Sequence, residues 1–180
     1  MYKNKWHDKI RIMTASAMMT ALSIIIGIFC KSYLNFGMGL FRITFENLPI
    51  ILSGILYGPI IGGVVGVASD LISYMLSPQV YPPNLVVTFG AMMSGVVSGL
   101  VARFIVRRKG SLQIIVAGAL AHIISSMLIK TAGLYQFYGL SVLWRIPLYM
   151  CIVPVEILII CLLLRRKSFA RIVGYIGEKS

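Results

Sequence analysis

The stretch from Arg42 to Leu76, RITFENLPIILSGILYGPIIGGVVGVASDLISYML, decides the fold of this chain. It contains two apolar runs joined by a tight turn at Tyr57-Gly58-Pro59, a pattern typical of a membrane hairpin. An acid, Asp70, lies inside the second run, where lipid makes a charge costly unless it has a partner or a task. Glycines recur at every fourth position, at 54, 58, 62 and 66. They indicate one helical face that a neighbouring backbone can approach closely. The stretch predicts a compact membrane bundle with a polar centre.

The bulk composition agrees with a membrane protein. The chain is 58% hydrophobic and 12% charged, whereas soluble domains are about 25% charged. A single membrane domain over residues 1–180 is expected, because each span takes about 20 residues and leaves no room for a soluble catalytic or ATP-hydrolysing domain. The three cysteines lie in or beside apolar runs without paired spacing, so neither a disulfide framework nor a metal site is predicted.

The apolar runs predict an all-α integral membrane protein, a bundle of six transmembrane helices. Their ranges are about 12–30, 43–56, 60–76, 85–106, 112–129 and 144–164, with a cytoplasmic tail at 168–180. All but four of the 17 lysines and arginines fall at the N-terminus, at 103–109 or at and beyond the end of the last span, from Arg165 onward. Because cytoplasmic loops hold the cations, both termini are predicted inside. The net charge of +12 then reflects topology and lipid headgroups rather than nucleic-acid binding.

The four remaining cations flank the segments predicted to face outward, 31–42, 77–84 and 130–143. Taken singly, each is explained by snorkelling to headgroups. Together with the aromatic residues gathered on the same side, they indicate a pocket for a flat, partly apolar, anionic ligand. The candidate carboxylate partners are Lys31, Arg42, Lys130 and Arg145; the candidate walls are Tyr33, Tyr74, Tyr81 and Trp144; and the candidate readers of a ring edge are Gln79, Asn84 and Asp70.

The acids and the histidine within the spans leave alternatives open. Asp70 either reads the ligand or neutralises a neighbouring cation. Glu46 follows Arg42 by four residues, where helical spacing predicts a local salt bridge. His122 and Glu156 lie mid-span and are interpreted as members of a buried polar network, although with Asp70 they also suit the proton path of a self-sufficient ion-coupled carrier. No motif of a hydrolase, phosphate-binding loop or metalloenzyme is present, so no enzyme activity or cofactor is predicted.

These features resemble the substrate-binding S components of energy-coupling factor (ECF) vitamin importers. The resemblance covers most of the chain and includes LPIILSGILYGPIIGGVVGVASDLI (48–72), the AxxxA pair Ala17 and Ala21, and the GxxxG pair Gly95 and Gly99. The pairs Leu48-Pro49, Gly58-Pro59 and Asp70-Leu71, with the cations beside the outer loops, are most similar to the folate-specific branch. The pantothenate, riboflavin and queuosine-precursor branches share parts of this pattern.

The resemblance implies a division of labour between subunits. An S component in the bacterial plasma membrane binds the vitamin from outside and docks onto a module of two ATPases and a transmembrane coupling protein. Ala17 and Ala21 would let a partner helix lie close, although packing within the bundle is the alternative. For a folate, the pocket would hold cations at the carboxylate tail, aromatic walls along the middle and polar groups at the pterin edge.

Overall fold

The structure is a computed structural model that describes residues 3–36, 41–42, 44–76, 84–106 and 110–166. The described chain is helical apart from two-residue strands β1 (Asn35–Phe36) and β2 (Phe41–Arg42), which pair antiparallel. The predicted all-helical fold is therefore confirmed. The helices are α1 (Lys3–Tyr33), α2 (Asn47–Tyr57), α3 (Pro59–Leu76), α4 (Leu85–Leu100), η1 (Val101–Ile105), α5 (Ser111–Ala121), η2 (His122–Lys130), α6 (Thr131–Tyr138), η3 (Gly139–Trp144) and α7 (Arg145–Arg165).

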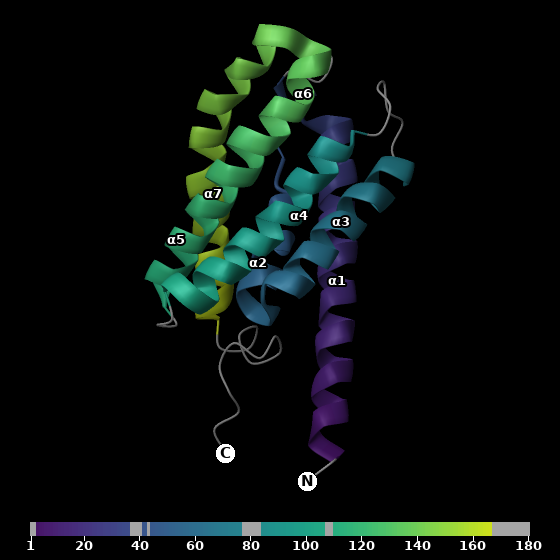
Figure 1. Ribbon diagram of the computed structural model, residues 1–180, viewed down its shortest axis with the longest axis vertical. Helices are drawn as coiled ribbons and strands as arrows, with labels where there is room; N and C mark the ends of the chain where they lie inside the picture. The colour runs from purple at the N-terminus through teal and green to yellow at the C-terminus, as the bar shows by residue number, and fades with distance from the viewer. Residues whose placement is uncertain (1–2, 37–40, 43, 77–83, 107–109, 167–180) are drawn as a thin grey trace.

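Five helical stretches of the described chain are long and apolar enough to cross a membrane. They are Lys9–Tyr33, Pro59–Leu76, Leu85–Ile105, Ser111–Gln136 and Gly139–Arg165. The sixth apolar helix, α2, has 11 residues and spans about 16 Å, about half of a bilayer core. It packs in the interior, where nine of its residues are buried. The start of α1 and the end of α7 lie at the same end of the bundle (Figure 1), as the predicted orientation requires.

The segment 130–143 differs from its prediction as a loop. It is helical, because η2 continues into α6 and then into η3. The helix axis of α5 therefore runs on through η2 and α6 to the far end of the bundle, where η3 leads into the descending α7 (Figure 1). The tyrosines and glycines that favoured a loop are accommodated on this helical rod, and Gly139 supplies a left-handed turn with φ 56° at its end. Lys130 consequently lies within a helical rod rather than beside an outer loop.

The glycines bring α2, α3 and α4 together at backbone distance. A Cβ placed on Gly95 would stand 2.1 Å from the carbonyl oxygen of Gly62, and one on Gly54 would stand 2.4 Å from the carbonyl oxygen of Gly95. The predicted close approach is therefore confirmed. The single helical face is not, since Gly58 turns the chain at φ 101° and places Gly54 and Gly62 opposite each other across the hairpin.

The orientation in the membrane can be tested with two serines at opposite ends of one rod. Ser141 and Ser111 are both exposed, and Ser→Cys changes size little. In a background without the three native cysteines, Ser141→Cys should react with a membrane-impermeant thiol reagent added outside intact cells, and Ser111→Cys should react only after permeabilisation, because positive charge retains the segment before Ser111 in the cytoplasm. The reverse pattern of labelling would contradict the predicted orientation.

Candidate ligand-binding site

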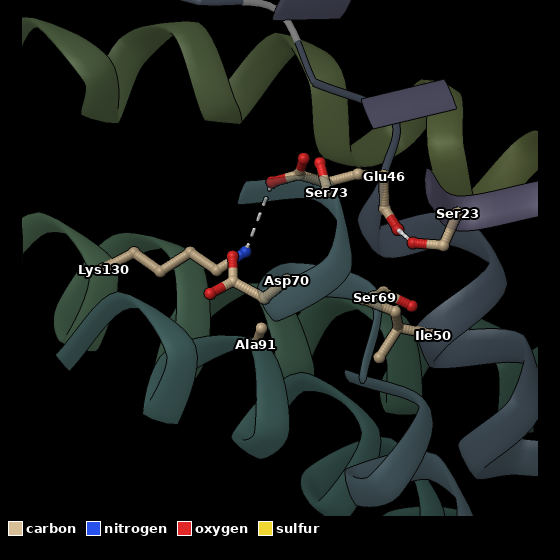
Figure 2. Close-up of a pocket in the computed structure, with 8 residues that line it drawn as sticks. All are labelled: Ser23, Glu46, Ile50, Ser69, Asp70, Ser73, Ala91 and Lys130. Atoms are coloured by element: carbon tan, nitrogen blue, oxygen red, sulfur yellow. Dashed lines mark hydrogen bonds and ion pairs between the residues drawn. The ribbon is translucent and has the colours of Figure 1, made fainter. Parts of the chain in front are cut away.

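A small cavity lined mainly by polar residues lies among α1, α2, α3, α4 and η2 (Figure 2). The space open to the centre of a water molecule is about 10 Å³, which is room for about one water. Side chains from five elements, far apart in sequence, converge on it, and the close helix packing at the glycines makes this convergence possible. The lining residues are Ser23, Glu46, Ile50, Ser69, Asp70, Ser73, Ala91 and Lys130.

Lys130 is the cation of the cavity. Its side chain leaves η2 and is only 4% exposed. The ammonium donates a hydrogen bond to Oδ1 of Asn47 at 2.9 Å and lies 3.7 Å from Oε1 of Glu46, an ion pair too long for a good hydrogen bond. Burial of an ammonium is costly without such partners. The predicted pocket cation is thus inside the bundle and not at the headgroups.

The position of Glu46 corrects the helical spacing that was assumed for Arg42 and Glu46. Arg42 lies in β2 and Glu46 caps the N-terminus of α2, so the helical spacing that predicted their salt bridge does not exist. The Glu46 carboxylate instead approaches Lys130 (Figure 2), and Ser23 on α1 donates to its backbone carbonyl at 2.7 Å. Tertiary packing therefore brings a cation from a distant part of the sequence to Glu46, and a contact with the Arg42 side chain lies outside the described residues.

The other acid of the cavity, Asp70, comes from α3. Its Oδ2 accepts a hydrogen bond from the hydroxyl of Thr88 on α4 at 2.7 Å, and Asp70 and Lys130 both line the cavity (Figure 2). Both roles considered for Asp70 from the sequence, reading a ligand and balancing a cation, are compatible with this position. A ligand group that enters the cavity meets a cation and an acid together.

Two further predicted residues, Lys31 and Asn84, join helices of the bundle. Lys31 on α1 donates to the hydroxyl of Ser73 at 2.7 Å, so that it contacts a lining residue. Asn84 caps α4 by accepting from the backbone N–H of Val86 at 2.9 Å. Its side-chain amide also donates to the carbonyl of Gly133 at 2.6 Å and fastens the start of α4 to α6. Asn84 therefore acts on the position of helices around the cavity.

Two of the predicted aromatic walls, Tyr33 and Tyr74, have described side chains and do not line the cavity. Tyr33 is 71% exposed, and its ring lies tilted against that of Phe29 with ring centroids 4.9 Å apart. Tyr74 on α3 is partly exposed. Gln79 and Tyr81 lie outside the described residues, as do the side chains of Arg42, Trp144 and Arg145. The assignments of these residues remain predictions.

Sequence reasoning missed the small polar residues of the site. Ser69 and Ser73 flank Asp70 on one face of α3, and Asn47 follows Glu46 directly. The spacing of four between Ser69 and Ser73 was a usable signal, because polar residues at that spacing share a helical face. Asn47 is fully buried and holds Lys130, and no local pattern indicates that role.

A chain of buried polar groups continues from Lys130 into the bundle. Asn47 donates through Nδ2 to the hydroxyl of Ser126 at 3.3 Å, and this hydroxyl lies 3.4 Å from Nδ1 of His122. Nε2 of His122 contacts the Oε2 carboxylate oxygen of Glu156 on α7. The prediction that His122 and Glu156 belong to a buried polar network is confirmed.

A bundle of apolar helices around a small cavity that combines a buried cation with carboxylates defines a membrane protein of the ligand-binding, transport type. The family model of the ECF transporter substrate-specific component matches residues 11–176. The chain belongs to this family and is a transporter component.

Solved structures agree with this assignment. A crystal structure of FolT bound with folic acid is similar with a TM-score of 0.63 and 16% identity, over 92% of this chain and 94% of that one. A structure reported as the S component of a bacterial ECF transporter is similar with a TM-score of 0.63 and 21% identity, over 89% of this chain and 96% of that one. At these identities the likeness shows the fold. No curated protein sequence matches the chain.

Proposed function

We propose that this chain is the S component of an ECF importer that binds a folate in the bacterial plasma membrane. The observation that carries the proposal is the buried ammonium of Lys130 in a cavity that also contains the carboxylate of Asp70. Paired donors and acceptors of this kind suit the edge of a heterocycle. The family membership and the shared fold with folate-bound FolT support a vitamin as the ligand.

The charge balance of the cavity favours the pterin end of a folate over its glutamate tail. Among the described residues, Lys130 and the nearby Lys31 supply two positive charges, and Glu46 and Asp70 supply two negative charges. A doubly charged tail would add repulsion with both carboxylates, whereas a neutral ring edge with donors and acceptors adds none. We therefore propose the ring end for Lys130, in place of the tail that the sequence suggested, and retain Arg42 and Arg145 for the tail.

Binding must widen the cavity. Ligand sites for molecules of this size commonly measure about 300–1,000 Å³, and the present cavity holds about 10 Å³. The Lys31–Ser73 hydrogen bond joins α1 to α3, and the Asn84–Gly133 hydrogen bond joins the start of α4 to α6. These contacts are the ones that must lengthen when a ring enters.

The test is to purify the chain alone and identify its bound vitamin by mass spectrometry, followed by calorimetry with folate, pantothenate, riboflavin and a queuosine precursor. Folate should bind most tightly. Tight binding of another vitamin would reject the folate assignment and keep the S-component role.

A self-sufficient ion-coupled carrier is the second candidate, because the buried chain from Lys130 to Glu156 offers groups for a proton path. Vesicles that contain only this chain separate the two functions. A binding subunit should hold the vitamin without accumulating it, whereas a carrier should accumulate it under a proton gradient.

The docking role of α1 yields a further prediction. Ala17 and Ala21 are both exposed, so the structure does not place them inside the bundle, and we propose that they receive a helix of the coupling protein. Ala17→Trp combined with Ala21→Trp should abolish co-purification with the ECF module while leaving vitamin affinity within about twofold, since each bulky ring blocks close helix approach. Ala132→Trp, on an exposed position of α6, is the matched control. Normal assembly of the double variant would assign the pair no docking role.

A further inference from the structure

The polarity of the buried chain can be derived from its first member. Lysine ammonium groups donate and never accept, so the Asn47 atom that faces Lys130 must be the amide oxygen. The amide nitrogen of Asn47 then faces Ser126 and donates to its hydroxyl oxygen. Among the described residues, the structure records Nδ1 of His122 as the remaining partner of that hydroxyl. A hydroxyl that accepts from Asn47 still has its own proton to donate, and Nδ1 of His122 is the acceptor that this chain of contacts offers it.

The same reasoning fixes the proton on the imidazole. Because Nδ1 of His122 accepts from Ser126, this nitrogen carries no hydrogen. The ring hydrogen is then on Nε2, which contacts the carboxylate of Glu156. In this tautomer the N–H at Nε2 faces the carboxyl group of Glu156, so the chain runs in one direction from Lys130 to Glu156.

The direction of these hydrogen bonds matters because the chain from Asn47 to Glu156 is buried. Asn47, Ser126 and Glu156 are fully buried, and His122 is 1% exposed. Water cannot replace a lost partner at such positions, and an unmade hydrogen bond there is costly. Ser126 and Lys130 both lie on η2, a π-helical segment with wider turns than an α-helix, and π-helical segments are frequent at functional sites.

From these observations, we infer that Asn47 is a positioning residue for Lys130, and that its amide is oriented by a one-way hydrogen-bond chain through Ser126 and neutral His122 to Glu156. The carboxylate of Glu46 also attracts the ammonium from 3.7 Å. The Asn47 oxygen holds it at 2.9 Å without neutralising its charge. The ammonium is thereby fixed at the cavity with donors available to a ligand. The ligand part of this inference rests on the proposed function, whereas the direction of the chain does not.

The decisive variant is Asn47→Asp, which keeps shape and the acceptor for Lys130 but removes the donor to Ser126. The hydroxyl of Ser126 must then donate to the new carboxylate, and Nδ1 of His122 must become the donor. The chain has two histidines, so nitrogen-15 histidine labelling gives few signals, and His122→Gln assigns those of His122. NMR of the ligand-free protein should show Nδ1 unprotonated in the wild type and protonated in Asn47→Asp.

The ligand arm uses Ser126→Ala and Asn47→Leu. Loss of one positioning contact should lower the affinities for folate and for a glutamate-free pterin by the same factor. The expected loss is about tenfold for Asn47→Leu and less for Ser126→Ala. Ser125→Ala is the matched control, because Ser125 is an equally buried neighbour on η2 that bonds Ser94 and the carbonyl of Ala121 instead. It should leave the His122 signals and both affinities unchanged.

The outcomes separate the two proposals. An unprotonated Nδ1 in Asn47→Asp, or a protonated Nδ1 in the wild type, overturns the one-way chain. A changed His122 signal with unchanged affinity in Asn47→Leu overturns the positioning role. Failure of the wild type to bind any folate or pterin rejects the proposed function, and the NMR comparison still decides the chain.

Discussion

Gly95→Ala should strongly destabilise the folded bundle, with an expected loss of about 3 kcal/mol or more because core overpacking reaches this size when the backbone must move. The added Cβ would lie 2.1 Å from the carbonyl oxygen of Gly62, and this neighbour is backbone that cannot rotate away. Separation of α3 from α4 would also open the cavity between them. The midpoint of thermal unfolding in detergent, followed by size-exclusion chromatography, measures the loss.

Gly110→Ala is the matched control for this prediction. Gly110 has no atom within 4 Å of an added Cβ, and its φ of 168° is extended backbone that any residue adopts. This variant should retain the thermal midpoint of the wild type within a few degrees. If Gly95→Ala unfolds at the same temperature as Gly110→Ala, the close backbone contact is not what holds α3 against α4.

The fold was largely predictable because its determinants are local. Apolar runs of membrane length and a four-residue glycine spacing need no knowledge of tertiary contacts. The helical character of 130–143 was not predictable, since its tyrosines and glycines favour a loop and continuity with η2 comes from packing. The contact between Gly54 and Gly62 was not predictable from their spacing either. It requires the positive φ of Gly58, which turns the chain and places the two glycines on opposite arms of the hairpin.

Sequence reasoning found the residues of the site whose burial carries a large free-energy cost, and missed the others. Lys130, Asp70, His122 and Glu156 drew attention because ionisable groups inside spans require a reason, and the structure gives each of them a polar partner. Asn47 and the serines were missed, because small polar residues are common in membrane helices and their partners are set by neighbouring helices. The helical spacing assumed for Arg42 and Glu46 was wrong for the related reason that a rule for helices was applied across the start of α2, and the contact between their side chains stays a prediction.

Lys130→Met and Arg42→Gln should separate the two ends of a bound folate. Methionine keeps much of the lysine volume and removes the charge, so Lys130→Met should weaken folate and 6-hydroxymethylpterin alike, by roughly ten- to a hundredfold for a lost charge-assisted hydrogen bond. The expectation follows from the cavity, where Lys130 lies with Asp70 and Glu46 and where a neutral ring edge is favoured. Calorimetry on the purified chain gives both affinities.

Arg42→Gln should lower the affinity for folate by about tenfold and leave the affinity for 6-hydroxymethylpterin unchanged, because only folate carries the carboxylates that a guanidinium binds. Equal thermal midpoints for both variants and the wild type ensure that affinity and not folding is compared. A loss confined to folate in Lys130→Met would place the tail at Lys130, as the sequence first suggested, and would reject the ring-inward orientation. Unchanged affinities in Lys130→Met would remove the cavity from the binding site, because its buried cation would then serve only Glu46 and Asn47.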